Sequence, residues 1–313
     1  MTTISTPVEQ GPTTTGLVGR PDVNRKRMAR LGWAFSAPAL FIIAAVTIFP
    51  IIYSVAMSLS NVTVTGNGFS LNGFTWSNYS LVVQSPKWHY ALGFTLVYTF
   101  GTVLAELVLG TMIALVLQRL TAGRGWMMAL LLIPWSMITV INAELWQYIF
   151  NSTYGVATYL FGLNNVLGTP TPAIIALAIA DIWKTTPFVA IIVLAGLVML
   201  PGDIYEAAEV DGSSGWSTFW RITVPLLRPT LALAVLFRVL QAFGLFDLPY
   251  VMTSAGPERQ VLEHHVVAQD GQRGGRRAGP GAAVAVTTAL LVLLGCLISL
   301  RAFKVQVGSE GTS

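Results

Sequence analysis

Acidic, small and turn-forming residues are gathered between residues 200 and 228, in a chain whose other long segments are mostly hydrophobic. Asp203 can cap a short helix whose first turns hold Glu206, Ala207 and Ala208, because acidic residues suit that end of a helix. Gly212 can break this helix and turn the chain back. We call this segment the polar hairpin. The simplest role for it is to lie on the membrane surface, as amphipathic hairpins of many membrane proteins do.

Other kinds of chemistry find little support. The chain has no Gly-x-x-x-x-Gly-Lys-Ser/Thr segment and so no loop of that kind to hold the phosphates of ATP. No nucleophile and base stand in an arrangement typical of an enzyme. His89, His264 and His265 lack a cysteine or carboxylate at ligand spacing, so we predict no metal site. We therefore expect a chain that is not an enzyme and that binds no cofactor itself.

The composition is that of a polytopic membrane protein. Of 313 residues, 54% are hydrophobic and 10% are charged, against roughly 25% charged in a soluble domain. The apolar runs are continuous rather than alternating, which favours helices over barrel strands, because backbone in hydrocarbon must satisfy its own hydrogen bonds. No basic surface with interleaved aromatic residues indicates nucleic acid.

Six apolar runs are long enough for the ~20 residues that a membrane span needs. They cover residues 31–59, 91–118, 126–150, 172–199, 229–251 and 282–303. The sequence therefore predicts an all-α polytopic membrane protein with six transmembrane helices. We expect a disordered tail at 1–30, the transmembrane domain at 31–303 and a second tail at 304–313.

Positive charges predict the orientation of these spans. Basic residues gather at one end of the runs: Arg25, Lys26, Arg27, Arg30, Arg119, Arg124, Arg221, Arg228, Arg301 and Lys304. The first loop at the opposite end carries only Lys87, and residues 151–171 carry no charge. Both termini and the polar hairpin should therefore lie in the cytoplasm.

The spacing within the polar hairpin is more specific than its composition. Glu206-Ala-Ala, three residues, Gly212, nine residues and then Ile222-x-x-Pro225 resembles the EAA loop of binding-protein-dependent ABC importer permeases. One position departs from the family, which usually has Leu where Val224 stands. The resemblance implies a type I ABC importer transmembrane domain in a bacterial cell membrane.

The resemblance also implies how the hairpin works. The helix with Glu206 would dock in a cleft of a separate ATPase subunit, which binds ATP and magnesium. Glu206 would face a basic group there, Ala207 and Ala208 would allow close approach, and Gly212 would provide the bend. Ile222 and Pro225 complete the motif. The implied partners are a second permease subunit, two ATPase subunits and an extracytoplasmic sugar-binding lipoprotein.

Two further segments resemble the carbohydrate subgroup of these permeases. They are Asp181-Ile-Trp-Lys-Thr-Thr-Pro187-Phe188 and Phe237-Arg-Val-Leu-Gln-Ala-Phe-Gly-Leu-Phe-Asp247-Leu-Pro-Tyr250. The pattern is similar to the maltose-importer F-type subunit and, through most of residues 30–257, to the trehalose importers of actinobacteria. It implies import of a sugar, for example the disaccharides trehalose or maltose. The segment from Phe74 to Tyr79 resembles an external motif of sugar permeases, or is an interfacial aromatic belt.

Charged residues inside spans are rare and usually face the bundle interior or a water-filled cavity. The candidates here are Glu106, Glu144, Asp181, Lys184, Arg238 and Asp247. In one interpretation they form a network in which Asp181 or Glu106 neutralises Arg238 or Lys184 and fixes helix packing. In the other they line the substrate path. A sugar needs neutral hydrogen-bonding groups and aromatic faces, so the candidates for substrate contact are Asn142, Trp146, Trp183, Gln241 and Phe243.

An ion-coupled secondary transporter is the main alternative function. The acids Glu106, Glu144 and Asp181 could carry protons. However, no pair of matching broken-helix halves is visible, and the EAA spacing would then have no purpose.

Residues 258–281 break the positive-inside pattern, because they should lie outside and yet carry four arginines. They also lose the family likeness that returns at Gly281. A pair of compensating reading-frame errors would explain both features. A true insertion or a basic patch is the alternative, and the nucleotide sequence would distinguish them.

Overall fold

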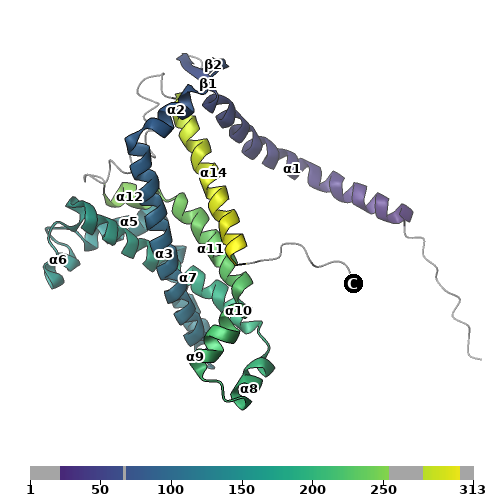
Figure 1. Ribbon diagram of the computed structural model, residues 1–313, viewed down its shortest axis with the longest axis vertical. Helices are drawn as coiled ribbons and strands as arrows, with labels where there is room; N and C mark the ends of the chain where they lie inside the picture. Colours follow the sequence, from purple (N-terminus) through teal and green to yellow (C-terminus); the bar gives the residue numbers. More distant parts are fainter. Residues whose placement is uncertain (1–21, 66–67, 254–277, 304–313) are drawn as a thin grey trace, which may run out of the picture. The chain divides into compact units, whose positions relative to one another are not determined.

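The computed structural model describes residues 22–65, 68–253 and 278–303 (Figure 1). The chain divides into two compact units, residues 1–53 and 54–313. Most of helix α1 (Asp22–Ser58) belongs to the first unit. The second holds the β-hairpin and the remaining elements: β1 (Ser60–Thr65), β2 (Gly68–Phe74), α2 (Ser77–Gln84), α3 (Pro86–Arg119), α4 (Arg124–Ser136), α5 (Thr139–Ile149), α6 (Val156–Phe161), η1 (Val166–Gly168), α7 (Pro170–Val198), α8 (Gly202–Val210), α9 (Gly215–Thr218), the π-helical turn η2 (Phe219–Thr223), α10 (Val224–Leu226), α11 (Arg228–Phe243), α12 (Asp247–Met252) and α14 (Ala278–Ala302).

Helix α1 starts at Asp22, nine residues before the predicted start of the first span at Leu31. Arginine and lysine are good helix formers, so the basic stretch at 25–30 continues the helix instead of ending it. Apolar side chains such as Phe35 and Phe41 are exposed within this unit. A helix that is apolar all round suits a membrane span.

The described residues hold four helices that are long and apolar enough to cross a membrane, and six spans if each of two bent helix pairs counts as one. The four are α1 from Arg27, α3, α7 and α14. One bent pair is α4 with α5, and the other is the segment Gly215–Leu226 with α11. Six spans were predicted, and a largely helical membrane fold is what the structure shows.

Two of the predicted spans are not single helices. The run at 126–150 is broken between α4 and α5, which meet at 89°. Pro134 lies in the last turn of α4, where its ring and missing N–H disturb the helix. The run at 229–251 ends at Phe243, and Gly244 to Phe246 separate α11 from the short α12. Periodic hydrophobicity alone did not reveal either break.

The antiparallel hairpin of β1 and β2 was not predicted. It pairs Asn61 with Asn72 and Thr63 with Ser70, and the Asn72 amide donates to the Thr63 hydroxyl at 2.8 Å. Asn78, from the predicted external motif, is buried behind it. Its side-chain amide donates to the backbone oxygens of Ser58 and Ser60, both at 2.9 Å. Asn78 therefore fixes the point where α1 gives way to β1.

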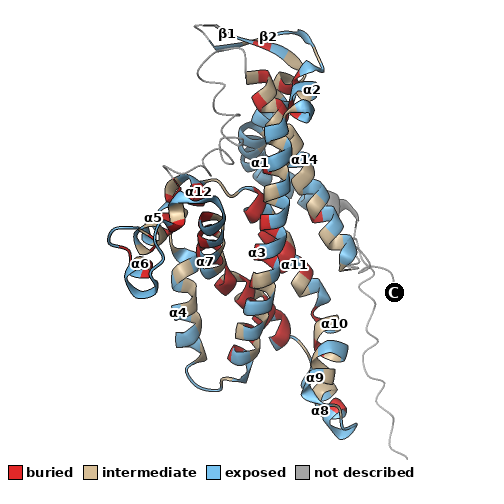
Figure 2. Ribbon diagram, turned by 60° about the vertical axis from the view of Figure 1, so that its left-hand side comes forward, coloured by how far each residue is buried: buried red, intermediate tan, exposed pale blue. Residues whose placement is uncertain are grey.

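The packed centre of the second unit is the contact of α3 with α7. Buried residues concentrate on α7 and on the sides of α3 and α11 that face it (Figure 2). Gly110 of α3 lies so close to α7 that a Cβ there would stand 2.8 Å from Val189 Cγ1 and 3.1 Å from the Ala190 backbone nitrogen. Such an approach is open only to glycine, so α3 and α7 form a closely packed pair.

Candidate functional site

The first limb of the polar hairpin is α8. Its N-cap is Pro201 and no side chain caps it, so the prediction that Asp203 caps the helix is wrong. Asp203 lies in the first turn instead, where its charge still suits the positive end of the helix dipole. Glu206 and Ala207 are exposed, whereas Ala208 is buried. The exposed face of α8 therefore presents a carboxylate beside a small side chain.

Gly212 turns the chain back, as predicted. Its φ of 69° lies in the left-handed region, which costs a residue with a Cβ about 1–2 kcal/mol. The Gly212 N–H donates to Glu209 O and the Ser213 N–H to Ala208 O, at 3.0 and 2.9 Å. These two bonds satisfy carbonyls at the end of α8, so the turn is well defined.

The second limb runs through α9, η2 and α10. The Tyr205 hydroxyl and the Thr223 hydroxyl lie 3.2 Å apart and join the two limbs. The rings of Trp216, Phe219 and Trp220 contact one another, with centroids 5.1–6.4 Å apart. Figure 1 shows α8, α9 and α10 together at one end of this unit, directly below α11. Ile222 and Pro225 are half-buried in this limb.

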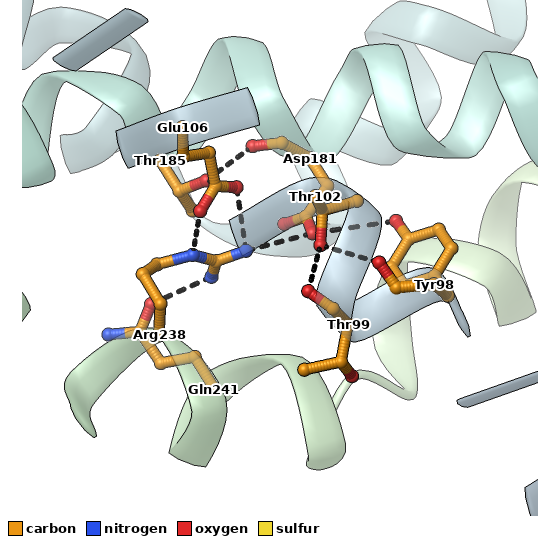
Figure 3. A network of polar contacts seen from close by, with 8 residues as sticks. All are labelled: Tyr98, Thr99, Thr102, Glu106, Asp181, Thr185, Arg238 and Gln241. Carbon is orange, nitrogen blue, oxygen red and sulfur yellow. Dashed lines mark hydrogen bonds and ion pairs between the residues drawn. The ribbon is translucent and has the colours of Figure 1, made fainter. Parts of the chain in front are cut away.

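A buried ion-pair network joins α3, α7 and α11 (Figure 3). Arg238 Nε and Nη2 bind the two carboxylate oxygens of Glu106, and Nη2 also donates to Asp181 Oδ2 at 3.0 Å. Glu106, Asp181 and Arg238 are 0%, 3% and 1% exposed. Burial without these partners would be strongly unfavourable for each charge, so the network requires the three helices to stay together.

Neighbouring hydroxyl groups complete the network. The Thr185 hydroxyl lies 2.6 Å from Glu106 Oε1, and the Tyr98 hydroxyl donates to Asp181 Oδ2 at 3.4 Å. The third partner of Arg238 is Gln241, whose Oε1 accepts from Arg238 Nη1 at 3.2 Å. Tyr98 and Thr185 were not among the predicted residues. Tyr98 precedes Glu106 by about two helical turns, which places both residues on the same face of α3. This spacing could have identified Tyr98 from the sequence.

A cavity of about 500 Å³ lies beside this network. Its volume falls within the range of roughly 300–1,000 Å³ that small-molecule sites occupy. We call it the main cavity, and it is lined by Trp135, Thr139, Asp181, Lys184, Thr185, Arg238, Leu240, Gln241, Gly244, Leu245, Phe246, Asp247 and Leu248. Polar and charged groups therefore share its wall with one tryptophan and one phenylalanine.

Of the residues predicted to contact substrate, only Gln241 lines the main cavity. Asn142 is fully buried in α5, and neither of its side-chain polar atoms has a partner among the described residues. Trp146 packs edge-on against Trp183. Phe243 lines a second, much smaller cavity of about 30 Å³ between α3, α11 and α14. The structure thus separates these four residues from the main cavity.

The predicted charged residues are also divided. Glu106, Asp181 and Arg238 form the network, while Lys184 and Asp247 line the main cavity. Within the described ranges neither Lys184 nor Asp247 makes an ion pair. Glu144 is exposed on α5 and is likewise without one there. Residues 254–277, which include most of the basic loop, lie outside the described part of the chain.

Comparison with known proteins gives relatives that are transport permeases. The chain is 34% identical over 280 residues to the trehalose/maltose transport system permease protein MalF of Thermococcus litoralis, covering 88% of this chain and 94% of that protein. It is also 34% identical over 275 residues to the trehalose transport system permease protein SugA of Mycobacterium tuberculosis H37Rv, covering 87% of each. No ion-coupled carrier stands among these relatives, so the alternative function has no support.

The fold has solved counterparts. A chain of a bacterial ABC transporter involved in the import of the acidic polysaccharide alginate superposes with a TM-score of 0.74 at 20% identity, over 90% of this chain and 97% of that one. The prediction of a type I ABC importer transmembrane domain is therefore confirmed. Residues 106–306, which include the polar hairpin and the three ion-paired residues Glu106, Asp181 and Arg238, match the family of binding-protein-dependent transport system inner membrane components, and the chain belongs to that family.

Proposed function

We propose that this chain is a permease subunit of an ATP-driven sugar importer, and that its substrate is a disaccharide such as trehalose or maltose. Two named relatives at 34% identity over nearly the whole chain support this substrate class. The structural observation that carries the proposal is that the polar hairpin joins α11 through the single residue Leu227, at a bend of 68°. Helix α11 supplies Arg238, Leu240 and Gln241 to the main cavity. A force applied at the hairpin can thus reach a polar cavity.

In this proposal the polar hairpin and both termini are cytoplasmic, as the basic residues at one end of the spans predict. Two ATPase subunits bind ATP and magnesium, and one of them contacts the exposed Glu206 and Ala207. A second permease subunit completes the translocation path. A sugar-binding lipoprotein delivers the solute from outside, which accords with the solved alginate transporter in complex with its periplasmic protein. This chain then contributes one half of the path and no chemical step.

The proposal predicts uptake that depends on ATP and on the binding protein. The test is to reconstitute the chain into lipid vesicles with a second permease of this family, an ATPase and a binding protein from the same organism, and to measure uptake of labelled trehalose and maltose. Uptake should require ATP on the side of the ATPase and should persist when an uncoupler removes ion gradients. Uptake by the chain alone, or uptake abolished by the uncoupler at constant ATP, would contradict it.

Gln241 is the substrate contact that the cavity supports best. Arg238 occupies its carbonyl oxygen, so its amide nitrogen keeps two donors for hydroxyl oxygens of a sugar. We expect Gln241→Glu, which retains an acceptor for Arg238 but lacks those donors, to raise the solute concentration for half-maximal uptake about 3- to 10-fold, as the loss of about one hydrogen bond implies. Gln118→Glu, at an exposed site on α3, is the matched control and should leave this concentration unchanged.

The aromatic candidates for substrate contact remain part of the proposal in a different role. Trp146 and Trp183 contact each other at a centroid distance of 5.8 Å, and Trp183 is 38% exposed. An exposed indole face can stack on a sugar ring if the helices rearrange during transport.

Asn142 has buried polar atoms without a partner in the described structure, and such atoms carry a free-energy cost that a new partner would relieve. These residues are therefore candidates for another state of the cycle.

A further inference from the structure

Arg238 is placed to hold three helices by one side chain. A guanidinium has five N–H groups, and those of Arg238 reach Glu106 on α3, Asp181 on α7 and Gln241 on its own helix (Figure 3). The Glu106 contact uses both carboxylate oxygens, and the Asp181 and Gln241 distances are 3.0 and 3.2 Å. Only the planar fork of arginine can make all of these bonds at once.

The helices joined in this way also pack directly against one another. The α3–α7 pair is in close contact at Gly110 and Val189. Helix α11 approaches α7 closely near its start, where a Cβ on Gly196 would stand 2.5–2.9 Å from the Thr230 side chain. Eight residues later, about 12 Å further along the helix, Arg238 makes the second attachment. Beyond it lie Gln241 and the turn 244–248, which form one wall of the main cavity.

The network holds two carboxylates for one guanidinium. A buried charge that loses its only partner is strongly unfavourable. Because Glu106 and Asp181 lie on different helices, Arg238 can loosen its bond to one of them and still keep the other. A displacement of α11 relative to the α3–α7 pair therefore does not leave the guanidinium without a carboxylate. The released acid keeps a hydroxyl partner within that pair, Thr185 for Glu106 or Tyr98 for Asp181. A single arginine–carboxylate pair would not have this property.

We propose that Arg238 is a positioning residue for transport, which ties the cavity end of α11 to the α3–α7 pair and keeps a carboxylate partner while α11 moves. A displacement of the polar hairpin would then move the wall of the main cavity, because α11 is held at Arg238 and does not simply bend. This inference rests on the proposed function, because it takes the hairpin as the place where the ATPase acts. A purely structural network would stabilise the bundle without affecting how much solute each ATP moves.

The test measures the number of solute molecules taken up per ATP hydrolysed by the complete importer in vesicles. We expect Arg238→Lys to assemble and to hydrolyse ATP in response to the loaded binding protein, yet to move at least fivefold fewer solute molecules per ATP. Lysine keeps the charge, but its three N–H donors are all on one nitrogen. They cannot reach both carboxylates and Gln241 as the wider guanidinium does. Arg119→Lys, at an exposed site at the end of α3, is the matched control and should keep the normal ratio.

A second variant guards against a folding defect in the first. Asp181→Asn leaves Arg238 paired with Glu106 and removes only the alternative partner, so it should assemble and should also lower the ratio. A normal ratio in both variants would overturn the proposal, as would losses of uptake and ATP hydrolysis in equal proportion to a loss of assembled complex. If the unmodified importer shows no ATP-dependent uptake, the proposed function itself has failed, and this result is distinct from a normal ratio in the variants.

Discussion

Glu206→Lys is expected to lower ATP-driven uptake at least tenfold and to leave the subunit folded in the membrane. The side chain is exposed on α8 and makes no ion pair among the described residues, so its replacement removes no internal contact that holds the fold. In the proposed complex Glu206 faces a basic group of the ATPase, so a lysine there would replace attraction by repulsion, and like charges across an interface cost several kcal/mol. Each 1.4 kcal/mol is a factor of ten in affinity, so we expect uptake to fall at least tenfold.

The measurement is co-purification of the ATPase with the tagged permease, together with uptake in intact cells. Asp211→Lys is the matched control, because it makes the same reversal of charge at an exposed residue of the hairpin. Asp211 lies five residues further on and so about 140° around the helix axis from Glu206. Its variant should retain both uptake and the ATPase. Normal uptake by the Glu206 variant would show that this face of α8 does not bind the ATPase.

Gly110→Leu is expected to prevent stable folding. A Cβ at this position already stands 2.8 Å from Val189 Cγ1 and 3.1 Å from the Ala190 backbone nitrogen, and the remaining atoms of a leucine have no space. Inserting extra carbon atoms into a packed core typically costs about 1–3 kcal/mol and occasionally more, and here the obstruction includes rigid backbone. The expected result is a large loss of folded protein in the membrane, measured as the monodisperse fraction in detergent and its melting temperature.

Gly101→Leu provides the comparison on the same helix. No atom lies within 4 Å of a Cβ at Gly101, and leucine is a better helix former than glycine. This variant should therefore fold as well as the unmodified chain. Equal yields and melting temperatures for the two variants would mean that α3 and α7 do not approach each other as the structure shows.

Much of the fold follows from the sequence because lipid imposes a strict rule on the backbone. Long apolar runs must be helices, and four of the six predicted runs are single long helices. What hydropathy cannot show is where a run bends. The break between α4 and α5 and the stop at Gly244 depend on local backbone geometry, and apolar residues continue on both sides. The β1–β2 hairpin was missed although the sequence carries signals for it. Val62 and Val64 alternate with threonines, Phe69 and Leu71 alternate with polar residues, and Asn67-Gly68 stands between the two runs.

The site was predictable to a different degree in its two parts. Within the polar hairpin, Gly212 turns the chain back as predicted, and it does so in the left-handed conformation that glycine adopts readily. In the membrane interior, the sequence identified Glu106, Asp181 and Arg238 as rare buried charges but could not say which carboxylate meets the arginine. The answer is both, because α3 and α7 pack closely enough to bring the two acids to one guanidinium. Residue spacing carries no information on such packing between distant helices.

The π-helical turn at Phe219–Thr223 gives the hairpin a tolerance in length. Here the Val224 N–H bonds to Phe219 O, five residues back instead of four, and a single wide turn of this kind holds one residue more than a regular α-helical turn. Deleting one residue there should restore the ordinary bonding pattern and leave the segments on either side in phase. The same deletion inside α11 would rotate everything beyond it by about 100°. A one-residue deletion at this turn should therefore leave Arg238 facing Glu106 and Asp181.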